Sequence, residues 1–378
     1  MRIPFNKAFM TGNELRYVED VLRHSKTSGD GVYTDKCQRL MEQRFGAAKV
    51  LLTTSCSTAL ELAVLLADLS PGDEVILPSF TFVSTANALI LRGVVPRFVD
   101  IRPDTKNLDE NLIAAAITPR TRAIMPVHYA GVGCDMRAIM DIAQAHSLMV
   151  IEDAAQGVNA RFESDYLGTI APLGAYSFHE TKNYSAGECG AIVINDPALI
   201  ERAEILREKG TNRSQFNRGQ VDKYTWVDIG SSFLPSDLLA AVLYAQLEAM
   251  DAISAHRERI YEHYMRRMQP LAEDGRVSLP VIPDECQSNY HMFYLTTTDI
   301  EERTALISHL RQRDILAVFH YVPLHNAPMA QQLGLPQHEL PVTQAVSERL
   351  VRLPMYCELT TADIDSVCDA VVEFYSGD

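Results

Sequence analysis

From about residue 48, short apolar runs alternate with amphipathic stretches along the chain. The runs are KVLLTT, DEVILP, VVPRFVD, TRAIMPV and SLMVIED, and the helical patterns cover 57–69, a segment from 82, 109–117 and 134–146. Two more short runs, GAYSF and GAIVIN, follow. Apolar runs separated by helices are typical of βαβ units, whose largely parallel sheet is buried on both faces. We therefore predict a doubly wound α/β domain that binds ligands at the carboxyl ends of its strands.

Beyond residue 236 the pattern changes. A long helical stretch covers about 236–268, followed by NYHMFYLTT, a helix over 301–313, ILAVFHY, and helices over 342–350 and 361–375. This mixture predicts a smaller α+β domain, with the large domain over 1–250 and the small one over 251–378. The polar stretch 209–232 is irregular, and a connection of that length in a compact protein is typical of a functional loop.

Composition narrows the classes of function. The 378 residues carry a net charge of −15, which argues against a basic nucleic-acid-binding face. The N-terminus lacks the apolar core of a signal peptide, and no apolar run reaches the ~18 residues of a membrane span. Seven scattered cysteines without a CxxC pair favour a reducing compartment and argue against a structural zinc site. We expect a cytoplasmic protein without metal, nucleic acid or membrane partners.

A run of small hydroxyl residues lies between a predicted strand and helix, in TTSCSTALELA. Backbone N–H groups of Cys56 and Ser57 at a helix start, with hydroxyls nearby, form an anion site. The alternative is an ordinary Ser/Thr helix cap, which is the commoner outcome. Neither GxxxxGK[ST] nor GxGxxG is present, so the nucleotide-hydrolysing and NAD-binding classes lose their main support.

Three residues follow the next strands. Phe82 begins a helix after DEVILP, and it belongs either to the core or to a surface on which a flat cofactor stacks. Asp153 ends the run SLMVIED, where it either caps the next segment or presents a carboxylate at the edge of the sheet. Gln156, three residues on, faces the same ligand or is a loop residue.

Lys182 lies 29 residues after Asp153. It completes a set of four features, each of which is weak evidence of function when taken alone. In chain order the set is a helix-start anion site, an aromatic ring, a strand-end carboxylate and a lysine. Pyridoxal phosphate (PLP) requires these parts for its phosphate, its ring, its pyridine nitrogen and its aldehyde, which forms a Schiff base with a lysine. We therefore predict that Asp153 pairs with the pyridinium and that Lys182 carries the cofactor and moves protons.

The chain resembles the DegT/DnrJ/EryC/StrS family of PLP-dependent sugar aminotransferases, which have an aspartate-aminotransferase-like fold (PLP fold type I). The resemblance covers nearly the whole chain. It is carried by TSCSTALELA, PGDEVILPSFTFVSTANA, PRFVDIRPDTKNLD, AIMPVHYAG, VIEDAAQG, YSFHETKNYSAGECGA and FHYVPLH. It implies a cofactor site of Lys182, Asp153, Gln156, Phe82, Cys56, Ser57 and Ser177.

The resemblance also implies substrate contacts and a partner. His128 and Tyr129 are implied to line the sugar pocket, with Tyr321 and His325 near it, although a packing role for these histidines is equally compatible with the sequence. Arg213, Arg218 and Lys223 are candidates for the diphosphate of a sugar nucleotide, or are exposed loop charges. Relatives place an Asn on the neighbouring subunit's cofactor, so the chain, with Ser232 at that position, is implied to be a homodimer with shared active sites.

Three positions depart from the family pattern. Cys56 and Ser57 replace Gly-Thr, Cys189 replaces a glycine after the lysine, and the GxNxR block reads GSSFL. The first two changes bear on the phosphate turn and on the loop after Lys182, because a side chain is tolerated only where the backbone does not need a positive φ.

Within the family, SFHETKNY and the 208–232 stretch are most similar to the subgroup that forms dTDP-4-amino-4,6-dideoxygalactose for enterobacterial common antigen, a lipopolysaccharide-related glycan. The resemblance thus implies transfer of an amino group from L-glutamate to dTDP-4-dehydro-6-deoxyglucose. Another 3- or 4-aminotransferase of the family and a non-catalytic regulatory protein are the alternatives. A sugar dehydratase of this fold would carry His in place of Lys182.

Overall fold

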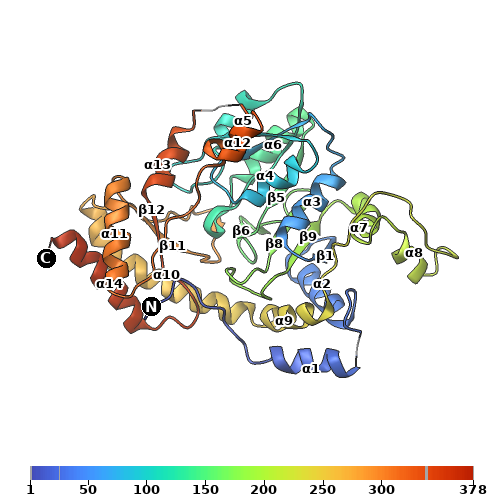
Figure 1. Cartoon of the computed structure of the whole chain (residues 1–378), viewed down its shortest axis with the longest axis horizontal. Coiled ribbons are helices and arrows are strands. Elements are labelled where there is room, and N and C mark those ends of the chain that lie inside the picture. Colours follow the sequence, from blue (N-terminus) through green and yellow to red (C-terminus); the bar gives the residue numbers. More distant parts are fainter. Residues whose placement is uncertain (1, 25, 337–338, 378) are drawn as a thin grey trace.

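The computed structural model describes residues 2–24, 26–336 and 339–377. Its centre is a seven-stranded sheet in the order β1-β9-β8-β5-β4-β2-β3 (Figure 1). The strands are β1 (Lys49–Thr53), β2 (Glu74–Pro78), β3 (Val95–Val99), β4 (Thr121–Ile124), β5 (Met149–Asp153), β8 (Leu173–Ser177) and β9 (Gly190–Ile194). β9 runs antiparallel to both neighbours and the other strands are parallel, as predicted for a largely parallel sheet.

Helices cover both faces of this sheet, and alternate residues of each strand supply the two cores. In β1, Val50 and Leu52 belong to the core under α2, α6 and α9, whereas Leu51 belongs to the core under α3, α4 and α7. The period of two along a strand produces this division. The helices of this part are α1 (Glu14–His24), α2 (Val32–Phe45), α3 (Cys56–Leu66), α4 (Val83–Ile90), α5 (Glu110–Ala116), α6 (Met136–His146), α7 (Ile200–Arg207), α8 (Arg213–Asn217) and α9 (Asp237–Glu248).

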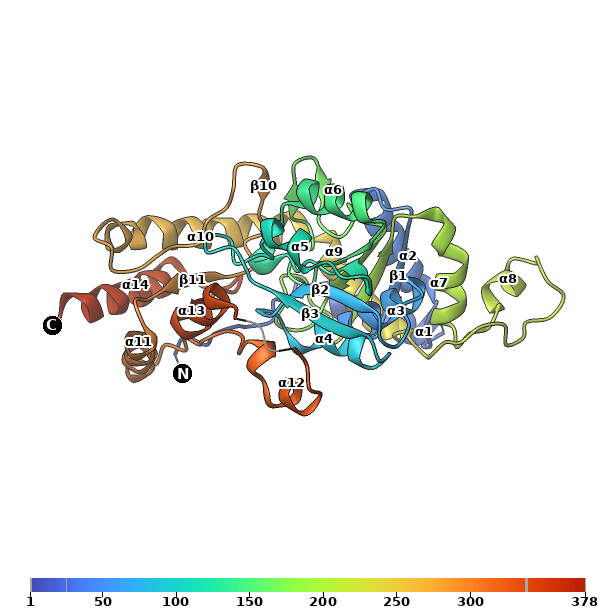
Figure 2. The ribbon, with the colours of Figure 1, turned by 90° about the horizontal axis from the view of Figure 1, so that it is seen from above.

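A smaller core lies at the other end of the molecule, where a two-stranded sheet packs with long helices (Figures 1 and 2). Its elements are α10 (Met250–Glu273), β11 (Phe293–Thr296), α11 (Ile300–Gln312), β12 (Leu350–Leu353) and α14 (Thr361–Ser376). The single helix predicted over 236–268 is two helices, α9 and α10, which meet at 61°. The bend falls beside the predicted boundary at 250/251.

The remaining described elements are short. They are β6 (Arg161–Phe162), β7 (Asp165–Tyr166), β10 (Cys286–Gln287), α12 (Pro328–Gln332), α13 (Pro341–Arg349) and the 3₁₀ turns η1 (Tyr129–Gly131), η2 (Pro197–Leu199) and η3 (Leu324–Asn326). The chain also crosses between the cores. Leu324 and Leu340 pack into the core of the large domain, although they follow residue 251.

The first residues of the chain pack beside the small core. Ile3 pairs with Ile315 and is fully buried among the residues of that core. No periodic pattern marks so short a segment, and its place depends on a contact about 310 residues away in the chain.

The irregular stretch 209–232 forms an arm that carries α8 away from the rest of the molecule (Figure 2). Thr211 pairs with Trp226 at its base, and the Trp226 side chain is 77% exposed. Within the described residues, no single helix has the length and apolar character to cross a bilayer; only the bent pair α9–α10 passes that test jointly. The same described ranges contain no cluster of three metal-ligating side chains.

Candidate active site

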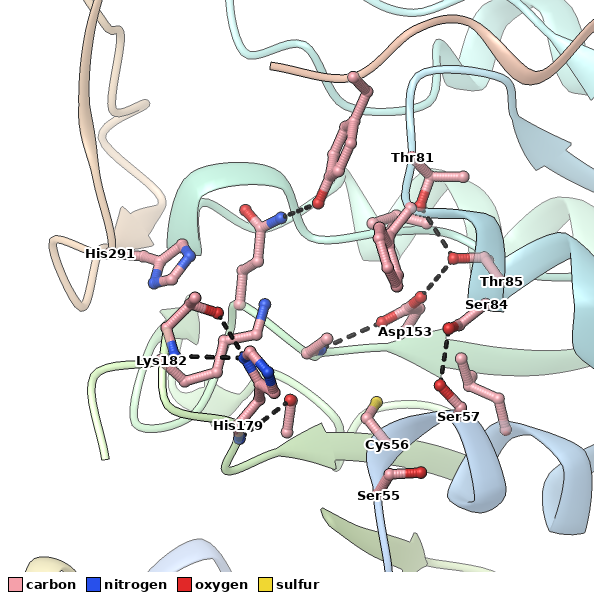
Figure 3. Close-up of a pocket in the computed structure, with 18 of the residues that line it drawn as sticks. Ser55, Cys56, Ser57, Thr81, Ser84, Thr85, Asp153, His179, Lys182 and His291 are labelled. Atoms are coloured by element: carbon pink, nitrogen blue, oxygen red, sulfur yellow. Dashed lines mark hydrogen bonds between the residues drawn. The ribbon is translucent and has the colours of Figure 1, made fainter. Parts of the chain in front are cut away.

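A cavity of about 540 Å³ opens where the parallel strands end, between the large and small cores. The turns after β1 and β2, the end of β5, the loop between β8 and β9 and segments of the small domain form its wall (Figure 3). The structure brings together in it eight residues that the sequence singled out: Cys56, Ser57, Phe82, Asp153, Gln156, Ser177, Lys182 and Tyr321.

The start of α3 forms one end of this cavity. The Ser55 side chain accepts a hydrogen bond from the Thr58 amide and caps the helix, so both interpretations of this motif apply together. The amides of Cys56 and Ser57 precede the first intrahelical bond and have no helical acceptor. The Ser57 hydroxyl donates to Ser84 Oγ at 2.6 Å. Free amides at a positive helix end suit a phosphate.

A close approach of backbones holds this turn in place. A Cβ on Gly190, the first residue of β9, would lie 2.3 Å from the carbonyl carbon of Ser55, so only glycine fits there. Cys56 is the first residue of α3 and does not have a positive φ. Cys189, beside Gly190, does not have a positive φ either. Both departures from the family pattern are therefore compatible with the backbone. Burial raises the pKa of both thiols, which keeps them neutral.

Asp153 ends β5 and is buried at the floor of the cavity. Its Oδ2 accepts from the Thr85 hydroxyl at 2.7 Å and its Oδ1 from the Ala155 amide at 3.1 Å. Burial raises the pKa of Asp153, while these hydrogen bonds and the nearby Lys182 act in the opposite direction. A carboxylate held in this way favours a positively charged partner in the cavity, because such a partner removes its uncompensated charge.

Lys182 points into the cavity from the loop between β8 and β9, on the opposite side from Asp153 (Figure 3). Its amide donates to the His179 carbonyl at 2.9 Å, and the Glu180 amide donates to Gly187 at 2.9 Å, so the loop is closed by its own backbone. Burial lowers the pKa of Lys182, and Asp153 opposes that shift. The lowered pKa increases the share of unprotonated amine, the form that reacts as a nucleophile and accepts a proton.

Gln156 and Phe82 line the cavity beside Tyr321. Gln156 Oε1 accepts from the Ala130 amide at 2.7 Å, and its Nε2 donates to the Tyr321 hydroxyl at 2.8 Å. Phe82 is 57% exposed and lines the cavity, so it is not a core residue. Its ring centroid lies 6.4 Å from that of Tyr321. These rings leave apolar surface for a flat ligand.

The small domain adds three residues that the sequence did not single out. His320 stacks on Tyr321 with centroids 3.7 Å apart, and His291 pairs with Asn183 at 2.9 Å. Arg352 of β12 completes this wall. Burial lowers the pKa of both histidines well below the usual range, which keeps them neutral. His320 and Arg352 follow apolar runs and His291 precedes one, in a region without βαβ periodicity, so no pattern in the sequence pointed to this wall.

Three residues implied to lie in or near the sugar pocket do not line the cavity. His128 is fully buried, where its Nε2 lies 2.9 Å from Glu152 and its Nδ1 accepts from the Cys134 amide. Tyr129 is buried with its hydroxyl against His320. His325 is buried and its Nδ1 lies 2.7 Å from the Ser79 hydroxyl. In this chain the three side chains pack behind the residues that line the cavity.

The remaining candidates also lie elsewhere in the protomer. Ser232 and Arg213 lie at a second concave surface, beside Glu208, which Arg213 contacts at 3.2 Å. Arg218 pairs with Glu204, and Lys223 is exposed on the arm. The structure of one protomer does not bring these residues to Lys182.

The donors in the cavity fit PLP. The helix start and Ser177 offer donors for a phosphate, Asp153 offers a carboxylate for a ring nitrogen, and Lys182 offers an amine for an aldehyde. The match is one of chemistry and arrangement. The helix start follows β1, Asp153 ends β5, Ser177 ends β8, and Lys182 lies in the loop after β8.

The comparison with known proteins agrees with this chemistry. The model of the DegT/DnrJ/EryC1/StrS aminotransferase family matches residues 9–372. This chain belongs to that family. PLP is the family's cofactor, and solved neighbours include a sugar aminotransferase described in PLP and PMP forms.

Relatives of this aminotransferase family match over almost their whole length. GDP-perosamine synthase of Caulobacter vibrioides is 32% identical and covers 96% of this chain and 95% of its own. Spore coat polysaccharide biosynthesis protein SpsC of Bacillus subtilis is 31% identical, with 99% and 97% covered. The structure of S. venezuelae DesV, in complex with a ketimine intermediate, has a TM-score of 0.88 at 30% identity and covers 98% of both chains.

Proposed function

We propose that this chain transfers the amino group of L-glutamate to C4 of dTDP-4-dehydro-6-deoxyglucose, giving dTDP-4-amino-4,6-dideoxygalactose and 2-oxoglutarate. The observation that carries the transamination is the placement of Lys182 and Asp153 in one buried cavity, on opposite sides of a space bounded by a helix start. The sugar, the nucleotide and the donor are supported by the resemblance of SFHETKNY and the 208–232 stretch to one subgroup.

Each residue has a defined task in this proposal. When bound, PLP supplies a conjugated ring that accepts the electrons released at the substrate carbon. Asp153 holds a proton on the ring nitrogen by charge pairing, and Thr85 and the Ala155 amide keep its carboxylate oriented. Gln156 and Phe82 fix the plane of the ring from its oxygen side and its face. The amides of Cys56 and Ser57, with the Ser177 hydroxyl, bind the phosphate.

Lys182 is the acid–base group of the proposed reaction. Its Nζ attaches the cofactor between turnovers and, once freed by an incoming amine, removes a proton from one carbon and returns it to another. The lowered pKa, caused by burial, suits an amine that must lose and regain a proton near neutral pH. The side of the keto sugar that faces this nitrogen sets the configuration of the product.

We infer that the working unit is a homodimer. Arg213, Lys223 and Ser232 do not reach the cavity of their own protomer, but the projecting arm and the surface at Ser232 are free to meet the cavity of a second copy (Figure 2). In that arrangement Ser232 donates to the partner's cofactor, and the basic residues of the arm bind the diphosphate.

A second candidate substrate is a GDP-linked keto sugar, because two GDP-perosamine synthases, from Caulobacter vibrioides and Escherichia coli O157:H7, are 32% and 30% identical to this chain. The deciding experiment incubates the PLP-loaded protein with glutamate and either the dTDP- or the GDP-4-keto-6-deoxy sugar. NMR of the product then assigns both the position and the configuration of the amine. We expect turnover with the dTDP sugar and an axial amine at C4, as in the galactose configuration.

Absorption spectra of the same PLP-loaded protein separate an enzyme from a regulatory protein of this fold. An enzyme shows a visible absorption band that shifts when glutamate is added. A protein that stays colourless with PLP overturns the proposal, and a product aminated at C3 assigns the chain to a 3-aminotransferase.

A further inference from the structure

A short segment before β11, residues 289–291, is tied to two loops of the cavity wall. Asn289 Nδ2 donates to two backbone carbonyls of the turn after β5, at 2.8 and 2.9 Å. The Asn289 carbonyl accepts from Asn183 Nδ2 at 2.8 Å, and Asn183 directly follows Lys182. Both asparagines are buried. The segment is therefore attached to the cofactor side of the cavity and to the loop that carries the lysine.

A buried arginine fixes the same segment from the opposite side. Arg257 of α10 donates from Nε to the Tyr290 carbonyl at 2.9 Å and from Nη2 to the His291 carbonyl at 2.5 Å. Tyr290 has a φ of 53°, in the left-handed region, which a residue with a side chain adopts only where its surroundings hold it. Contacts on both sides thus set the backbone from which the His291 ring projects.

The hydrogen bonds of Asn183 decide which nitrogen of His291 carries a hydrogen. Asn183 Nδ2 donates to a carbonyl, which can only accept, so it is Asn183 Oδ1 that lies 2.9 Å from His291 Nδ1. An amide oxygen cannot donate, and Nδ1 must therefore carry the hydrogen. Burial and the charge of Lys182 lower the pKa of His291 well below its usual range, which keeps the ring neutral. Hence Nε2 has a free lone pair.

This lone pair and the Lys182 amine share one cavity, and neither has a partner in the protein. Within residues 2–24, 26–336 and 339–377, no hydrogen bond engages His291 Nε2 or Lys182 Nζ. Both residues line the cavity on the same side (Figure 3). Among the charged groups around His291, Lys182 has the largest effect on its pKa. The smaller effects come from Arg257, Arg352 and His320.

The other groups that act on Lys182 are less suited to hold its amine. Burial keeps the Cys56 thiol neutral, and a thiol is a weak acceptor. Arg352 can only donate. The carboxylate of Asp153 lies on the opposite side of the cavity and already accepts two hydrogen bonds. An oriented imidazole nitrogen without a donor therefore complements a lysine amine without an acceptor.

We propose that His291 is a positioning residue for Lys182: its Nε2 accepts an N–H of the lysine amine whenever that amine is not bound to the cofactor. This inference rests on the proposed transamination and deepens it, because the amine must stay in one place while it takes and returns a proton. His291 itself takes no proton. The hydrogen on Nδ1 stays with Asn183, and Nε2 only orients the amine.

Two variants separate the two nitrogens of His291. His291→Asn keeps a donor at the place of Nδ1, for the contact with Asn183, and removes the acceptor in the cavity. His291→Gln instead offers an amide oxygen at the place of Nε2. His256→Asn is the matched control, because His256 is an exposed histidine of α10.

The test follows the modification of Lys182 by trinitrobenzenesulfonate against pH, in the full chain without PLP, with mass spectrometry of the Lys182 peptide. An acceptor stabilises an ammonium more than a neutral amine, so its removal should move the profile to lower pH. On the acidic limb, where most of the amine is protonated, modification should be at least ~3-fold faster in His291→Asn than in the wild type. His291→Gln and His256→Asn should keep the wild-type profile.

A kinetic readout tests the same assignment in the PLP-loaded enzyme. His291→Asn should lower kcat about 10-fold, because the amine is no longer held in place for proton transfer. The half-saturating glutamate concentration and the affinity for PLP should stay unchanged, since His291 holds neither ligand in this proposal. His291→Gln should recover most of the lost rate.

Two results overturn the assignment. One is an unchanged modification profile of Lys182 in His291→Asn. The other is an equal change of that profile in His291→Asn and His291→Gln, which would make His291 a structural residue of the loop. Failure of the wild type to react with glutamate counts against the proposed function instead. The modification profile still decides the role of His291 in that case, because it needs neither the cofactor nor a substrate.

Discussion

The two walls of the cavity are built in different ways. On the large-domain wall, Asp153 and Gln156 each have partners in the protein, through Thr85, the Ala155 amide and the Ala130 amide. On the small-domain wall, Arg352 has a buried Nε without an acceptor. The protein itself thus holds Asp153 and Gln156 in place, whereas Arg352 keeps unused bonding capacity.

This difference matches the ligands that each wall is proposed to meet. A cofactor that stays through both half-reactions is best held by groups fixed in advance, because no reorganisation is then needed during the reaction. Substrates that alternate in one cavity need groups that exchange partners. A similar contrast separates neighbours on β5: Glu152 accepts three backbone amides away from the cavity, while Asp153 faces into it.

Removing the lysine should give the largest effect. We expect Lys182→Ala to lower kcat by at least ~10²–10⁴-fold, because no other amine lines the cavity among the described residues. PLP should still bind through the helix start and Asp153, which equilibrium dialysis would show. Lys7→Ala, at an exposed lysine paired with Glu358, is the control. Steady turnover by Lys182→Ala would refute the role of this residue.

Neutralising the two carboxylates of β5 tests whether their different surroundings produce different roles. We expect Asp153→Asn to lower kcat by about 10²-fold with little loss of stability, because the amide cannot hold a proton on the ring nitrogen. Glu152→Gln should instead lower the free energy of unfolding by about 3 kcal/mol, since its backbone donors lose a charged acceptor. Rate assays and urea unfolding on both variants measure this. The reverse pattern would contradict the division.

The contact between the walls should give a smaller effect. Tyr321→Phe removes the acceptor of the Gln156 Nε2 hydrogen bond, which joins the small domain to the cofactor side. A neutral hydrogen bond contributes about 1 kcal/mol, so affinity for PLP should fall ~5-fold. Fluorescence titration with PLP checks this. An equal loss in Tyr224→Phe, at an exposed tyrosine on the arm, would argue for a general effect instead.

The smallest effect concerns pH. Burial lowers the pKa of Lys182 in the folded, cofactor-free protein below its value of 10.5 in the unfolded chain. Between these two pKa values the unfolded state binds more protons, so this lysine makes the folded state more stable as pH rises. We therefore expect Lys182→Met to be more stable than wild type at pH 7 and this advantage to shrink by pH 9.5. Urea unfolding at both values measures it, and a constant advantage would show that the lysine is not desolvated.

The sequence was most informative where residues near each other in the chain act together. Alternation of apolar runs with helices predicted the sheet, and Asp153 at a strand end and Lys182 in a loop line one cavity. It was less informative for residues carried over by resemblance: His128, Tyr129 and His325 do not line the cavity but pack behind its walls. The antiparallel direction of β9 could not be predicted from the sequence, because an apolar run does not indicate in which direction its strand runs.

Sequence alone therefore determined the family, the α/β class and the chemistry of the cofactor side, since a helix start and strand ends are local features whose ligands meet at one sheet edge by topology. Only the tertiary structure decided the substrate side. Ile3 joined the small domain through a pairing with Ile315, and Arg352 became a cavity residue because β12 packs between the Val318 segment and β11. Whether an arginine is exposed or lies in a cavity wall with its Nε unpaired depends on such distant contacts, and no local pattern encodes them.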